Sequence, residues 1–227
     1  MCIAILTTAG KQIDDSVFRR CWYANSHGFG MAYANPRAQS EVIIDKGYMT
    51  VESALKAYTR IAKTASEEGP VLLHFRAATV GDKGADNCHP FKVRGGAMVH
   101  NGTFFRDSSL TKSDSRVVAE TMHNELTYEN LTKHKEKFDD AFGYNRVAFL
   151  FGGGKYVIFS EHFNGKEGQY GQWADGIWYS NGGWRGDYNG YYGNGVCAET
   201  NNKLFPDFND DVALAALDAS LAKKINV

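Results

Sequence analysis

Short apolar runs, each about as long as a buried strand, recur along this chain between polar turns. Runs of this length that are bounded by turn residues and rich in β-branched or aromatic side chains are typical of strands. Three consecutive glycines at 152–154 separate two of the runs and predict a hairpin. We expect strands at residues 2–8, 28–33, 42–44, 71–76, 97–100, 145–151, 156–160 and 177–180.

Apolar residues spaced three or four positions apart predict amphipathic helices at 12–24, 51–66 and 114–125, and a further helix at the C-terminus between Asn209 and Lys224. The strands outnumber the helices and come in groups. This order favours an α+β sandwich over a doubly wound parallel sheet. We find no repeat and no convincing linker, so a single domain over residues 1–227 is expected.

Composition and charge exclude several classes of function. Hydrophobic residues make up 43% of the 227 residues and the net charge is −1. Such a balance gives no general attraction to nucleic acid or to an anionic membrane. No apolar run is long enough to span a membrane. The first residues lack the basic region of a secretory signal, so we expect a cytoplasmic protein.

Two further features of composition bear on function. The four cysteines, Cys2, Cys21, Cys88 and Cys197, include no closely spaced pair, so there is no C-x-x-C metal or redox motif. Residues 182–195 are rich in Gly, Tyr, Trp and Asn. Such a segment is ordinarily a surface loop, and a substrate lid or a partner surface is the functional alternative.

Cys2 is the first candidate for chemistry. Initiator methionine is normally removed before a small residue, so we expect Cys2 to become N-terminal. Its α-amine, with a reference pKa near 8, could then act as the general base for its own thiol. Taken by position alone, Cys2 would more often be an inert, buried strand cysteine, since most cysteines are inert.

Three later segments add candidate binding groups. Arg76 ends a predicted strand, where a buried arginine usually has an anion or a carboxylate as its partner. The Asn101 amide and the Gly102 N–H could donate to an oxyanion, although Asn-Gly is also a common hairpin turn. Asp114 could hold an ammonium group, although it is also an acceptable residue for a helix start.

In their order and spacing, these segments resemble the class II glutamine amidotransferase domain, a branch of the N-terminal nucleophile hydrolases. The resemblance covers residues 1 to about 125 on motif grounds, and the later strands are less specific. The motifs are Met1-Cys2-Ile3, Gly28-Phe29-Gly30, His74-Phe75-Arg76-Ala77-Ala78-Thr79, Asn87-Cys88-His89-Pro90, Val99-His100-Asn101-Gly102 and Ser113-Asp114-Ser115.

The resemblance implies a four-layer αββα sandwich and a set of roles. Cys2 would be the nucleophile, with its α-amine as base, and Asn101 and Gly102 would form the oxyanion hole. For glutamine, Arg76 with Thr79 would bind the α-carboxylate and Asp114 the α-ammonium. We expect His89 and His100 to be hydrogen-bonded structural residues. No metal or cofactor is expected.

The chain departs from the family's synthases at Ala77 and Val80, where those enzymes often carry Trp and His. It therefore looks more like the small stand-alone members. We expect a glutaminase that releases ammonia for a separate synthase subunit. A hydrolase of another γ-glutamyl amide and a catalytically silent binding module are the alternatives.

Overall fold

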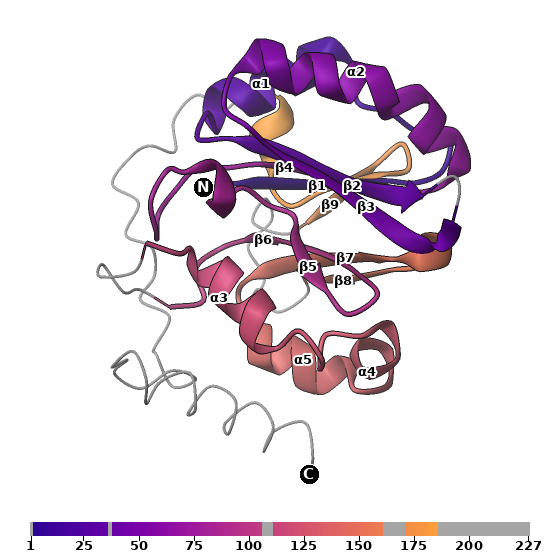
Figure 1. Ribbon diagram of the computed structural model, residues 1–227, viewed down its shortest axis with the longest axis vertical. Coiled ribbons are helices and arrows are strands. Elements are labelled where there is room, and N and C mark those ends of the chain that lie inside the picture. Colours follow the sequence, from indigo (N-terminus) through magenta and orange to yellow (C-terminus); the bar gives the residue numbers. More distant parts are fainter. Residues whose placement is uncertain (1, 36–37, 106–110, 161–170, 186–227) are drawn as a thin grey trace.

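The computed structural model describes residues 2–35, 38–105, 111–160 and 171–185 (Figure 1). The expected C-terminal helix and residues 186–195 of the aromatic segment lie outside these ranges. Within the ranges, no helix combines the length and the apolar character that crossing a membrane requires.

The described residues form two antiparallel sheets with five α-helices, which confirms the α+β class. The larger sheet has the strand order β3-β2-β4-β1-β10-β9. Its strands are β1 (Ile3–Thr7), β2 (Phe29–Asn35), β3 (Ala38–Tyr48), β4 (Val71–Phe75), β9 (Gln172–Ala174) and β10 (Ile177–Tyr179). The smaller sheet has the order β5-β6-β7-β8. Its strands are β5 (Phe91–Val93), β6 (Gly96–Asn101), β7 (Arg146–Phe151) and β8 (Tyr156–Phe159).

The sheets stack face to face, and helices cover both outer faces (Figure 1). On the outer face of the larger sheet lie α1 (Asp15–Ala24) and α2 (Val51–Glu68). The outer face of the smaller sheet is covered by α3 (Asp114–Thr121), α4 (Tyr128–Lys133) and α5 (Lys135–Phe142). Three short 3-10 turns complete the described elements: η1 (Ala85–Asn87), η2 (Gly152–Gly154) and η3 (Gly182–Arg185).

Strand β1 shows why this arrangement needs uninterrupted apolar runs. All five of its residues are buried. Successive side chains of a strand point to opposite faces. Ile3 and Ile5 therefore pack in the core beneath α1 and α2, whereas Ala4 and Leu6 pack in the core between the sheets.

The start of α3 has a bearing on the candidate site. Ser113 is the N-cap residue, and its hydroxyl accepts from the backbone N–H of Arg116 at 3.2 Å. A cap of this kind stabilises a helix by about 1 kcal/mol. Because Ser113 caps the helix, Asp114 lies in its first turn, with its carboxylate available for other contacts.

Candidate active site

Strand pairing brings several of the predicted site residues to the same end of the two sheets. Cys2 directly precedes β1 and Arg76 directly follows β4, and these two strands pair antiparallel. Ser180 follows β10, which pairs with the other side of β1, and the Ser180 N–H donates to Ala4 O at 2.9 Å. Asn101 is the last residue of β6 in the facing sheet. The nucleophile and oxyanion candidates thus come from different sheets.

The half-buried Cys2 thiol lies against the backbone that follows β4. Its Sγ is 3.3 Å from both Ala77 N and Ala77 O, so the N–H donates to sulfur and the thiol donates to the carbonyl. The Cys2 carbonyl accepts from Asn181 Nδ2 at 2.8 Å. Met1 lies outside the described residues, so its removal stays a prediction.

The surroundings of Cys2 make it a thiol that needs a base. Burial raises the pKa of the Cys2 thiol, and the Ala77 N–H and the Arg76 charge lower it by less. The thiol is therefore protonated at neutral pH, and only its thiolate is a competent nucleophile. The charge of Asp114 raises the same pKa, so the charges of Arg76 and Asp114 act on the thiol in opposite directions.

Arg76 is a buried cation whose hydrogen-bonding capacity is largely unused. Its side chain is 2% exposed. Nη2 donates to Val80 O at 3.2 Å, whereas Nη1 has no partner among the described residues. An unpaired buried charge costs several kcal/mol. The planar guanidinium is well suited to grip a carboxylate with two parallel hydrogen bonds. Such an environment suits a group that binds an anion.

Asn101 and Gly102 adjoin at the end of β6. Asn101 is fully buried, and its Nδ2 donates to Ser180 Oγ at 2.9 Å. Gly102 has φ +154°, and a Cβ there would clash with Asn145 Oδ1, so only glycine fits. Residues 103–105 are described and do not form a strand, and the next described element is α3. Asn101-Gly102 is therefore not the turn of a two-residue hairpin, and that alternative is wrong.

Asp114 has a structural role that the sequence did not predict. Its Oδ2 accepts from Phe104 N at 2.7 Å and its Oδ1 from Ser115 N at 2.8 Å. These bonds tie the loop that follows β6 to the start of α3. A carboxylate offers about four lone-pair sites, so Asp114 retains capacity for a substrate ammonium group.

Thr79 is the one predicted site residue that the structure leaves apart. It is exposed, and its side chain makes no hydrogen bond with the described part of the chain. The neighbouring positions contribute through their backbone instead, because Ala77 contacts the Cys2 thiol and the Val80 carbonyl accepts from Arg76. These are the two positions at which the sequence departs from the family's synthases, and their contacts do not depend on side-chain identity.

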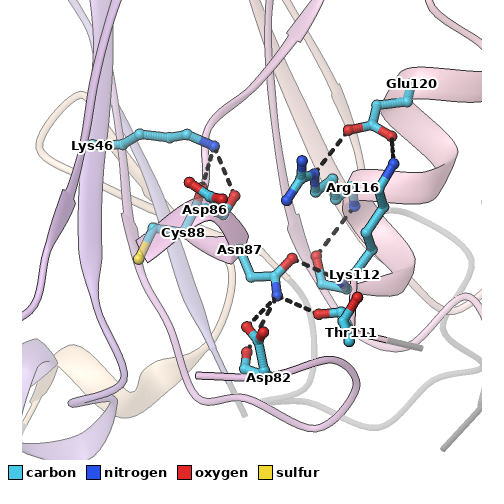
Figure 2. A network of polar contacts seen from close by, with 10 residues as sticks. Lys46, Asp82, Asp86, Asn87, Cys88, Thr111, Lys112, Arg116 and Glu120 are labelled. Carbon is cyan, nitrogen blue, oxygen red and sulfur yellow. Dashed lines mark hydrogen bonds and ion pairs between the residues drawn. The ribbon is translucent and has the colours of Figure 1, made fainter. Parts of the chain in front are cut away.

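Asn87, to which the sequence assigned no role, connects the loop after β4 to the start of α3 (Figure 2). It is 1% exposed. Its Nδ2 donates to Asp82 Oδ1 and to Thr111 O, both at 2.7 Å, and its Oδ1 accepts from Ser113 N at 2.9 Å. From the other side, Lys46 donates to two carbonyl groups of the same loop. These contacts hold the segment that follows Arg76 against the helix that carries Asp114.

Three buried histidines lie close to these residues. His100 is hydrogen-bonded as expected, through Nδ1 to Ser115 Oγ at 2.7 Å and through Nε2 to Asn145 Oδ1 at 2.8 Å. The expectation for His89 is wrong in one respect, because neither ring nitrogen has a partner among the described residues. Its ring stacks instead on His74 with centroids 3.9 Å apart. Burial lowers the pKa of all three and keeps them neutral at physiological pH.

No protein-family model matches this chain, and no curated protein matches it significantly. The likeness to class II glutamine amidotransferases therefore rests on short sequence motifs alone. A functional hypothesis rests on those motifs and on the geometry around Cys2.

Proposed function

We propose that this protein is a glutaminase of the class II amidotransferase type, in which Cys2 attacks the side-chain amide of glutamine and releases ammonia. The observation that carries the proposal is the buried Arg76 guanidinium, whose Nη1 has no partner among the described residues and which directly follows the strand paired with that of Cys2. An amidase for a free amino acid needs a nucleophile and, at a short distance from it, a group that binds the α-carboxylate.

The chemistry is acyl transfer in two steps. After loss of Met1, the neutral α-amine of Cys2 takes the thiol proton, and the thiolate attacks Cδ of glutamine. Asn101 Nδ2 and the Gly102 N–H stabilise the tetrahedral oxyanion. The protonated amine gives its proton to the departing ammonia. Water then hydrolyses the γ-glutamyl thioester, which yields glutamate and restores the thiol.

The arrangement of layers supports this proposal. The layers follow one another in the order helices, sheet, sheet, helices (Figure 1). This is the order expected of the four-layer αββα sandwich of N-terminal nucleophile hydrolases. The candidate nucleophile directly precedes a central strand of one sheet, and the candidate oxyanion donor ends a strand of the other. In this proposal the ammonia passes to a separate synthase subunit.

A second candidate uses the same nucleophile on another γ-glutamyl amide. Asp114 does not distinguish the two substrates, because a γ-glutamyl amide carries the same α-ammonium group as glutamine and Asp114 keeps the same two backbone N–H contacts in either case. Glutamine and a γ-glutamyl amide with a substituted amide nitrogen share the carboxylate that Arg76 would bind.

The test is a turnover assay on the purified protein with its N-terminus confirmed. We expect glutamine to give ammonia and glutamate in equal amounts, and Cys2→Ala to give neither. Faster release from γ-glutamyl methylamide than from glutamine would favour the second candidate. Calorimetric binding of glutamine without turnover would identify a silent binding module, and the absence of both binding and turnover would overturn the proposal.

A further inference from the structure

Ser180 joins the strand that follows the nucleophile to the buried amide of Asn101. The Ser180 side chain is fully buried, and its Oγ accepts from Ala4 N at 2.8 Å and from Asn101 Nδ2 at 2.9 Å. The Ser180 N–H also donates to Ala4 O at 2.9 Å. A single side chain thereby connects β1 in the larger sheet with the end of β6 in the smaller sheet.

The next residue holds the nucleophile itself. Asn181 Nδ2 donates to the Cys2 carbonyl at 2.8 Å, and Asn181 Oδ1 accepts from Gly183 N at 2.9 Å. The dipeptide Ser180-Asn181 therefore contacts both Cys2 and Asn101, which belong to facing sheets. Their separation depends on this short segment.

The contact with Ser180 also fixes the direction in which the Asn101 amide faces. A side-chain amide is planar and carries two N–H bonds on its nitrogen, so donating one of them to Ser180 sets the direction of the other. Asn101 Oδ1 is buried without a partner in the described ranges. Among these residues, Ser180 therefore makes the side-chain contact that holds the amide nitrogen in place.

We propose that Ser180 is a positioning residue for the oxyanion hole, which directs the second N–H of Asn101 toward the oxyanion formed at Cys2. This inference rests on the proposed function. Without the hydroxyl, the amide can rotate about its Cβ–Cγ bond and place its oxygen, instead of its nitrogen, next to the oxyanion. The amide oxygen carries a partial negative charge and would repel the oxyanion. The oxyanion exists only along the reaction coordinate, so kcat falls while substrate binding through Arg76 persists.

The test compares Ser180→Ala and the nearly isosteric Ser180→Cys with Ser66→Ala as a matched control. Ser66 is an equally buried serine on α2 that accepts from Gln12 Nε2 at 3.1 Å and donates to Lys63 O at 3.0 Å. Rates are expressed per Cys2 labelled by a reactive glutamine analogue, so that unfolded molecules do not count.

For Ser180→Ala we expect kcat to fall about tenfold with KM unchanged, less than the roughly 100- to 1000-fold loss for removing an oxyanion donor outright. The kcat of Ser180→Cys, whose sulfur is a weak acceptor, should lie between the values for Ser180→Ala and the parent. The kcat of Ser66→Ala should equal that of the parent. A parent-like kcat in Ser180→Ala, or an equal loss in Ser66→Ala, would overturn the inference and leave the proposed function standing. A parent that neither releases ammonia nor takes the label overturns both.

A readout independent of activity follows the amide itself. In a side-chain ¹H–¹⁵N spectrum, the Asn101 NH₂ pair is identified by its loss in Asn101→Asp. The pair should shift in Ser180→Ala and stay in place in Ser66→Ala. An unchanged pair in Ser180→Ala would contradict the hydrogen bond on which the proposal depends.

Discussion

Lowering the pH should destabilise this protein because buried histidines, most strongly His74 and His89, are neutral in the folded state. His74 and His89 stack against each other, and His74 Nε2 contacts His100 O of the facing sheet at 2.9 Å. Burial lowers the pKa of His74 to about 3 and that of His89 well below its usual range. In an unfolded chain, histidine titrates near 6.5.

The sign and the size of the effect follow from these pKa values. Below about pH 6.5 the unfolded chain binds more protons than the folded protein, so the free energy of unfolding falls as the pH falls toward the folded-state pKa values. When the pH falls from 7.5 to 5.5, a histidine that gains a proton only in the unfolded state lowers the free energy of unfolding by about 1.4 kcal/mol. The two together give about 3 kcal/mol, a large share of the roughly 5–15 kcal/mol typical of a domain.

Urea denaturation, followed by circular dichroism at both pH values, measures the difference. His89→Phe should reduce the pH dependence by about 1.4 kcal/mol, and it breaks no hydrogen bond to the ring in the described ranges. The control is Phe91→Leu, at the aromatic neighbour of His89, which should lower stability equally at both pH values. If His89→Phe and the parent show the same pH dependence, His89 is not held neutral in the folded protein and the reasoning fails.

Three further predictions, the first with a control variant, concern the site and its surroundings. Cys2→Ala should abolish ammonia release, whereas Cys21→Ala, which removes a buried thiol in the core beneath α1 and α2, should retain it; turnover by Cys2→Ala would require another nucleophile. Arg76→Lys should raise KM for glutamine by roughly 10- to 100-fold, because lysine cannot form the bidentate contact, and an unchanged KM would show that the carboxylate binds elsewhere. Asn87→Asp leaves the Thr111 carbonyl without its donor and should lower the free energy of unfolding by about 1–3 kcal/mol, so a melting temperature equal to that of the parent would contradict the role given to Asn87.

The sequence predicted those parts of the fold whose burial leaves a pattern in the chain. Strands β1 and β4 are buried on both faces, and their sequences are apolar apart from Thr7 and His74. Strands β5 and β9 have three residues each and include a polar residue, so they form no apolar run, whereas β10 is equally short but apolar throughout. The helical region that follows α3 is interrupted at His134, where one short helix ends and the next begins, so neither helix has the length that would reveal it.

For the candidate site, the sequence supplied residue types but not their contacts. Chemistry and motif order selected Cys2, Arg76 and Asn101 from the sequence. In the structure, each lies next to or at the end of a strand, at the same end of the sheets. Asn87 and Ser180 were assigned no role, because most of the partners that define them lie 24 to 176 positions away. Nothing local distinguishes a serine at a strand end from one that joins two sheets.

The central claim is that Cys2, with Met1 removed, is the nucleophile that reacts with a glutamine side chain. Intact mass measured before and after treatment with the glutamine analogue diazo-oxo-norleucine tests it most directly. We predict a starting mass without Met1, a single adduct that peptide mapping assigns to Cys2, and protection by excess glutamine. A protein that retains Met1 and still takes the label, or one that lacks Met1 and takes no label at Cys2, would contradict the claim.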